Sequence, residues 1–141
     1  MSPAKTLSLE LKRVVPAPPA KVYAAWMDPK QACNPWSSGK KLLYNPKADG
    51  LFYILGRHGS GVPHYGRFVA LARGRQVKHT WMSPFTRGLE STVTVTFVKK
   101  GDGTLMTLRH AGLPNDGYGR AHNDGWGHFF DEMGKRFPPG R

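Results

Sequence analysis

The feature that most constrains this sequence is a series of short, strand-like segments separated by short loops rich in glycine and proline. In residues 92–97, two valines and a phenylalanine alternate with threonines, as in a strand with one buried face. Connections this short join neighbouring antiparallel strands. The sequence therefore predicts an antiparallel sheet. Its central strands are expected at residues 51–55, 65–72, 77–82, 92–98 and 104–111.

The segments before this series add two further strands and two helices. Residues 6–11 alternate leucines with polar residues, and residues 41–44 can form a short edge strand, which gives about six to seven strands in all. Between them, a proline at position 18 or 19 can occupy the first turn of a helix, where its missing N–H group is harmless. Pro29 and Pro35 then divide this region into two short helices.

Residues 112–137 close the chain with helical periodicity despite repeated glycines, each of which costs a helix about 1 kcal/mol relative to alanine. At about 100° per residue, the aromatic residues Trp126, Phe129 and Phe130 share one stripe with Met133. Burial of these side chains contributes roughly 1.5 to 3 kcal/mol each, which outweighs the glycine cost. We therefore expect one long helix that is stable only when it lies across the sheet.

Two glycines of this helix, Gly119 and Gly125, remove side chains at or beside its predicted contact with the sheet. Two interpretations stay open, close packing of the backbones or open volume for a ligand. Asn115 or Asp116 is the expected N-cap. The order of strand, two helices, strands and helix predicts an α+β fold, and the length fits a single domain over residues 1–141.

Composition narrows the classes of function. The 141 residues include 21 Lys and Arg against 9 Asp and Glu, a formal net charge of +12, but the basic residues are scattered in pairs without interleaved aromatic residues. Specific nucleic-acid binding is therefore not expected. No segment has the length of a membrane span or a signal peptide, so we expect a cytoplasmic protein without membrane insertion. The single cysteine, Cys33, is expected to be a packing residue.

Several local motifs resemble those of one protein family. They are PPAKVYAAWMDP at 18–29, Trp36, GRF at 66–68, HTW at 79–81, GTLMTLRHAGLP at 103–114 and HNDGW at 122–126. Together they extend over nearly the whole chain and resemble bacterial members of the activator of heat-shock-protein-90 ATPase homologue family, in the START-like, SRPBCC superfamily. The resemblance implies a helix-grip, Bet v-like fold, in which a curved antiparallel sheet wraps the long C-terminal helix and leaves a cavity between them.

The resemblance does not imply one activity, because relatives in the superfamily include lipid and sterol carriers, polyketide cyclases and hormone receptors. The sequence also departs from the family pattern in its glycine-rich helix and in residues 56–61, GRHGSG. These residues lack the Gly-Lys-Ser/Thr of a phosphate loop, so they are expected to form a hairpin turn.

Three histidines are candidate polar groups inside the predicted fold. His79 and His110 are in phase with the inward residues of their strands, and His122 lies in the centre of the helical stripe. The expected apolar lining consists of Phe52, Ile54, Phe68, Trp81, Val93, Val95, Phe97, Met106, Leu108, Trp126 and Phe130. Such a pocket suits a small hydrophobic or aromatic molecule that an imidazole orients by a hydrogen bond. The alternative is that each histidine is a core residue bonded to backbone or water.

The favoured function is a non-enzymatic carrier or sensor of such a ligand, with no cofactor and no metal site. No carboxylate lies in an inward phase to partner a histidine, although a cyclase- or aromatase-like reaction with His110 or His122 as general acid or base stays open. A third hypothesis is a chaperone-cofactor-like protein of the stress response. Leu51, Tyr53 and Leu55 face outward in this scheme and could support self-association, which would give a monomer or a weak dimer.

Overall fold

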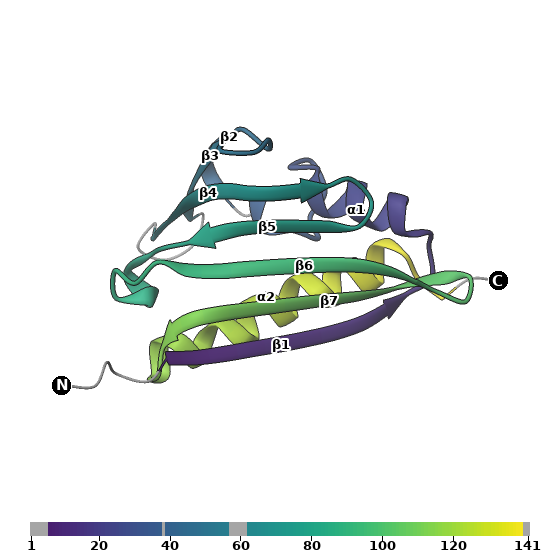
Figure 1. Cartoon of the computed structure of the whole chain (residues 1–141). Helices are drawn as coiled ribbons and strands as arrows, with labels where there is room; N and C mark the ends of the chain where they lie inside the picture. Colours follow the sequence, from purple (N-terminus) through teal and green to yellow (C-terminus); the bar gives the residue numbers. More distant parts are fainter. Residues whose placement is uncertain (1–5, 38, 57–61, 140–141) are drawn as a thin grey trace.

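The structure is a computed structural model, which describes residues 6–37, 39–56 and 62–139. Seven antiparallel strands form one curved sheet in the order β1-β7-β6-β5-β4-β3-β2, so the first and last strands lie side by side (Figure 1). The prediction of six to seven antiparallel strands is therefore confirmed. Residues 57–61, most of the predicted glycine-rich turn, lie outside the described residues. The strands are β1 (Thr6–Val15), β2 (Gly39–Tyr44), β3 (Leu51–Gly56), β4 (Pro63–Ala72), β5 (Gln76–Trp81), β6 (Ser91–Lys100) and β7 (Gly103–Pro114).

The connection between β1 and β2 contains one helix, α1 (Pro19–Met27), and one turn of 3-10 helix, η1 (Pro35–Ser37). The second of the two predicted helices is thus only a single turn. The side chain of Asn34 satisfies carbonyls at the end of α1, because its amide nitrogen donates to that of Ala25 at 2.8 Å and to that of Asp28 at 2.7 Å. The second helix stays short because β2 begins at Gly39, directly after this turn.

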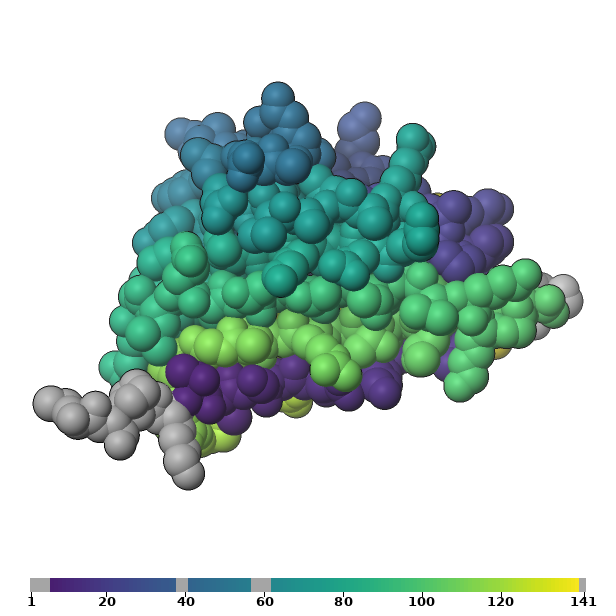
Figure 2. Space-filling model, viewed as in Figure 1, coloured from purple at the N-terminus to yellow at the C-terminus, as the bar shows by residue number. Residues whose placement is uncertain are grey.

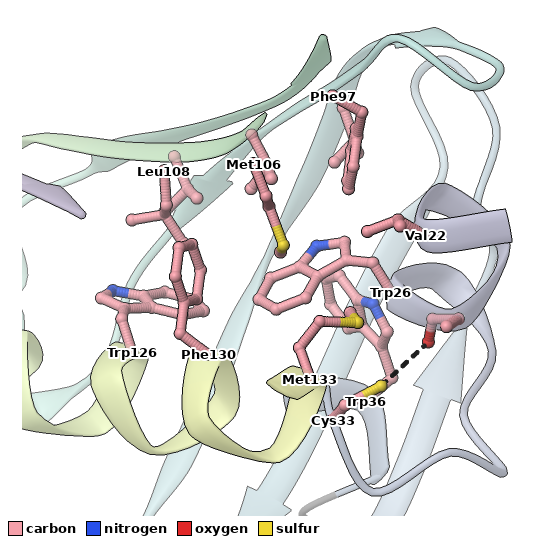
Figure 3. Close-up of a cluster of buried hydrophobic side chains, with 14 of the residues drawn as sticks. Val22, Trp26, Cys33, Trp36, Phe97, Met106, Leu108, Trp126, Phe130 and Met133 are labelled. Atoms are coloured by element: carbon pink, nitrogen blue, oxygen red, sulfur yellow. Dashed lines mark hydrogen bonds between the residues drawn. The ribbon is translucent and has the colours of Figure 1, made fainter. Parts of the chain in front are cut away.

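The long helix α2 (Gly117–Arg136) lies against β1 and β7 on the concave side of the sheet, while α1 packs beside β6 and β7 (Figure 1). In Figure 3, Trp126, Phe130 and Met133 of α2 point toward the strands. All three side chains are buried, and Trp26 of α1 packs against the first two of them. The predicted stripe is therefore the docking face of the helix, and the α+β helix-grip fold is confirmed.

The glycines of α2 have different roles. A Cβ atom at Gly119 would overlap the carbonyl oxygen of Pro114 at the end of β7, so this position requires close backbone packing. A Cβ atom at Gly125 would meet nothing within 4 Å. Close packing therefore applies at Gly119. Gly125 is exposed, so the open space beside it is solvent rather than enclosed volume for a ligand. The helix begins with Asp116 as N-cap, whose carboxylate accepts from the N–H of Gly119 at 2.9 Å.

This difference predicts opposite effects of the same substitution. Gly125→Ala should raise the free energy of unfolding by about 1 kcal/mol, because alanine removes the entropic cost of an exposed helical glycine. Gly119→Ala should lower it by about 1 to 3 kcal/mol, because the methyl group would force the helix away from β7. Urea unfolding of both variants measures the effects. Equal effects would contradict the assigned packing.

Candidate functional site

The register of the sheet decides which of the predicted histidines meet. His79 pairs with Val93 on β6, and Val93 pairs with His110 on β7. All three side chains lie on the concave face and have 0% exposed area. His79 and His110 therefore point inward, as their strand phase predicts, but one strand separates them and their surroundings differ.

His110 lies within a chain of hydrogen bonds that links α2 to the sheet. The indole N–H of Trp126 donates to Nδ1 of His110 at 2.9 Å. Because Nδ1 accepts, the neutral ring carries its proton on Nε2, which lies 2.7 Å from Oγ of Ser91. The Ser91 hydroxyl in turn donates to the backbone carbonyl of Trp81 at 2.6 Å. Both ring nitrogens of His110 are therefore occupied within the protein.

The protonation state of His110 agrees with these bonds. Burial, together with the nearby His122 and His79, lowers the pKa of His110 to about 2. The imidazole is therefore neutral at physiological pH. A role as general acid or base would require it to give up a bond to Trp126 or Ser91, so His110 holds the helix in place rather than presenting a free nitrogen.

His79 lies in a different environment, which we call the His79 cluster: His79, Trp36, Phe52, Phe68 and Trp81. The ring centroids of the other four residues lie between 5.2 and 5.9 Å from that of His79. Trp36 comes from η1 and the others from β3, β4 and β5, so the cluster joins the connection after α1 to the concave face of the sheet.

Among the described residues, one ring nitrogen of His79 has a hydrogen-bond partner and the other has none. Nδ1 lies 2.8 Å from the backbone carbonyl of Thr80, so Nδ1 carries the proton and donates. Nε2 is then an acceptor, and it is buried without a hydrogen-bond partner among the described residues. Burial lowers the pKa of His79 to about 4, although the bond to Thr80 opposes this shift. The neutral ring thus keeps a free lone pair inside an aromatic cluster.

Tryptophan donors complement this acceptor. Within the described part of the chain, the indole N–H groups of Trp36 and Trp81, both in the His79 cluster, are buried and unpaired, and so is that of Trp26. Leaving a buried polar group unsatisfied costs about 1 to 3 kcal/mol. The interior therefore holds one acceptor and several donors that the protein itself does not pair.

A second group of histidines lies toward the start of α2. The His122 ring is half-buried, and its centroid lies 5.1 Å from that of His110. Its Nδ1 is 3.0 Å from the carbonyl of Tyr118 in its own helix, and burial lowers its pKa. His64 on β4 has its ring 5.0 Å from Trp81, and burial, followed by the nearby His122, lowers its pKa to about 4. His122 thus contacts the ring of His110, and no ring contact or hydrogen bond joins it to His79 among the described residues.

Sequence reasoning missed three residues of this interior. His64 lies one residue before the predicted start of its strand at Tyr65. It is also two positions before Gly66, so it shares the inward phase of Gly66. Trp26 and Trp36 fit the helix-like spacing of apolar residues after Pro19, but this spacing does not show that they pack between the sheet and α2. The predicted lining residues are all buried, with at most 6% exposure: Phe52, Ile54, Phe68, Trp81, Val93, Val95, Phe97, Met106, Leu108, Trp126 and Phe130.

Other kinds of site find little support in the described residues. No group of three or more His, Cys, Asp or Glu side chains there has an arrangement that could hold a metal ion. In the same residues, no helix is both long and apolar enough to cross a membrane. Cys33 is buried, with its thiol 3.6 Å from the carbonyl of Ala25 (Figure 3). Among the described residues, the buried side-chain polar atoms without a hydrogen-bond partner are one imidazole nitrogen and three indole nitrogens.

The buried histidines predict loss of stability in acid. The pKa values of His64 and His79 are about 4 and that of His110 about 2 in the folded protein, against 6.5 for an ordinary histidine. Unfolded chains therefore bind more protons below pH 6.5, so stability is full above that pH and falls as pH drops toward 4. The urea midpoint should decrease markedly from pH 7.5 to pH 5, and His79→Phe should reduce that decrease. A midpoint independent of pH would contradict this.

Comparison with solved structures supports the fold. A protein of Chromobacterium violaceum superimposes with a TM-score of 0.77 at 22% identity, over 94% of this chain and 98% of the other. An HSP90 activator from Plasmodium falciparum gives 0.74 at 23%, over 92% and 94%. CalU16 from Micromonospora echinospora gives 0.73 at 21%, over 94% and 76%. At these identities the similarity shows the fold alone.

Comparison with protein families is more specific. A search of curated protein sequences gives no match. The profile of the family described as Activator of Hsp90 ATPase homolog 1-like protein matches residues 16–137, which include both helices and most of the sheet. The match confirms the resemblance seen in the sequence motifs. The chain therefore belongs to the family of activator of Hsp90 ATPase homolog 1-like proteins.

Proposed function

We propose that this protein binds a small, mainly apolar molecule that carries a hydroxyl group, between the concave face of β3–β5 and the helical segments that cover it. The protein acts as a carrier or sensor rather than as an enzyme. The observation that carries this proposal is the His79 cluster, where a buried acceptor, Nε2 of His79, and two buried donors, the indoles of Trp36 and Trp81, lack partners among the described residues.

The chemistry of these atoms selects the polar group of the ligand. A hydroxyl group can donate to Nε2 of His79 and accept from an indole N–H of Trp36 or Trp81 at the same time. A purely apolar ligand would leave all three groups unsatisfied, and a carboxylate would meet a neutral imidazole acceptor rather than a cation. The surrounding aromatic rings of Phe52 and Phe68 suit an apolar or aromatic body.

The histidine near α2 supports the choice of binding over catalysis. Both nitrogens of His110 are bonded within the protein, so the cyclase-like hypothesis loses one of its two acid–base candidates. Among the described residues, His122 bonds to backbone carbonyls of its own helix and to no carboxylate. We propose further that the chain works as one domain in the cytoplasm. We expect a monomer or a weak dimer, because a net charge of +12 opposes self-association.

A matched pair of probes tests the ligand class. Wild-type protein should bind 2-naphthol about tenfold more tightly than naphthalene, because only the former completes the hydrogen bonds of His79 and the indoles. In NMR spectra, the indole N–H signals of Trp36 and Trp81 should move downfield with 2-naphthol but not with naphthalene. His79→Phe should abolish the preference, since phenylalanine fills the space without an acceptor.

The control is His128→Phe, an exposed histidine on α2, which should keep the preference for 2-naphthol. The proposal is wrong if wild-type protein does not bind 2-naphthol, or if His79→Phe still prefers 2-naphthol to naphthalene. A melting temperature near that of wild type for both variants separates loss of the site from loss of the fold.

A second function, contact with a chaperone, is favoured by the family and by apolar residues on the outer face of the sheet. Leu43 is 64% exposed and Leu51 is 65% exposed, on neighbouring strands β2 and β3. Tyr53 and Leu55 are the remaining predicted outward residues on β3. Tyr53 pairs with Leu43 on β2 and with Tyr65 on β4. Exposed apolar side chains grouped in this way are typical of a protein contact.

This function predicts stimulation of the ATPase of an Hsp90-class chaperone by the wild-type protein. The double variant Leu43→Ser and Leu51→Ser should lose most of the stimulation while unfolding near the wild-type temperature, because both side chains are exposed. Val14→Ser together with Val98→Ser, two exposed valines on other strands, is the control. No stimulation by wild type would exclude this function for the chaperone tested.

A further inference from the structure

A groove separate from the His79 cluster lies where the β4–β5 turn, the end of β6 and the start of α1 meet. Its volume is about 560 Å³. Figure 2 shows these three segments, coloured teal, green and purple, together at one end of the molecule. The lining residues are Pro19, Ala72, Gly74, Arg75, Gln76, Thr96, Phe97, Val98 and Lys99.

The charged lining of this groove is entirely positive. Arg75 and Lys99 are exposed, and no other lining residue has a charged side chain. Neither side chain forms an ion pair within the described residues, whereas Arg13, Arg67, Arg87 and Arg109 elsewhere are paired with carboxylates. The groove therefore places two uncompensated cations beside one another on β6 and the β4–β5 turn.

The backbone adds a donor on the same side. Phe97 donates its N–H to the carbonyl of Arg75 at 2.8 Å, so alternate residues of β6 direct their backbone groups toward β5. The last pair between β5 and β6 is Gln76 with Thr96, whereas β6 continues to Lys100. By this alternation, the N–H of Lys99 is directed to the β5 side of β6, beyond the last described pair between these strands.

The rest of the groove combines apolar surface with the uncharged polar side chains of Gln76 and Thr96. Pro19, Ala72 and Val98 contribute aliphatic surface, and Val98 is 56% exposed. Gly74 adopts a φ of +77°, which other residues rarely do, and a Cβ atom there would lie 3.7 Å from Cα of Ala20. The β4–β5 turn therefore lies close to the start of α1.

We propose that this groove binds a small organic anion, a molecule with an apolar body and a carboxylate, sulfonate or phosphate group. The anionic group lies between Arg75 and Lys99, where the backbone N–H of Lys99 is a further donor. The apolar body covers Ala72 and Val98. Two cations in a groove of this size fit one anionic group rather than the repeated phosphates of a nucleic acid.

NMR titration of the wild-type protein with 4-phenylbutyrate tests the proposal, with neutral 4-phenylbutan-1-ol as matched probe. 4-Phenylbutyrate should shift the backbone amides of Gly74, Gln76, Val98 and Lys99, and the affinity should fall as salt rises. The alcohol should leave these amides unshifted. If inorganic phosphate alone binds here as tightly as 4-phenylbutyrate, the apolar body has no role and the proposal is wrong.

Variants separate this groove from the net charge of the protein. Arg75→Ala with Lys99→Ala should weaken 4-phenylbutyrate binding about tenfold. The control, Lys30→Ala with Lys47→Ala, removes the same charge from exposed positions outside the groove. It should change the affinity for 4-phenylbutyrate less than twofold. Equal losses in both variants, or no binding by wild type, would overturn the proposal. His79→Phe should leave the groove shifts intact, so this result does not depend on the interior site.

Discussion

The contact between Trp126 and His110 holds the long helix to the sheet, and the rest of the interior depends on it. Helix α2 has low intrinsic stability because of its glycines, so its position comes from the side chains that it buries. Trp126 contributes most specifically, since its ring packs 5.0 Å from Trp81 and its N–H bonds to His110. The same bond fixes the proton of His110 on Nε2 and so directs it toward Ser91.

This contact divides the interior into two parts with different chemistry. On the side of β6 and β7, the polar atoms of His110 and Ser91 satisfy one another, and this side is structural. On the side of β3–β5, the acceptor of His79 and the donor of Trp36 remain without partners among the described residues. Since both parts lie in the same sheet and are equally buried, burial alone does not distinguish core from site. The two parts differ in hydrogen-bond satisfaction, because both ring nitrogens of His110 are paired and Nε2 of His79 has no partner among the described residues.

Much of this architecture follows from periodicity. The period of two placed His79 and His110 on the inner face, and the period of 3.6 placed Trp126 in the docking stripe. Tertiary contacts decided the rest. Gly119 and Gly125 differ only because the carbonyl of Pro114 approaches one of them. His79 and His110 lie on the same face of the sheet with Val93 of β6 between them, and this strand order is not written in the local sequence. The second predicted helix is a single turn because β2 begins directly after it, at Gly39.

The net charge of +12 has no role in the interior, because the fully buried polar residues are uncharged at neutral pH. It must therefore act at the surface, where the attraction of a single exposed cation for an anion is weak and screened by salt. An exposed cation becomes selective only where a second cation and apolar surface lie beside it. Among the paired arginines and scattered lysines of this fold, the end of β6 meets that condition, since Arg75 and Lys99 share one groove with Val98.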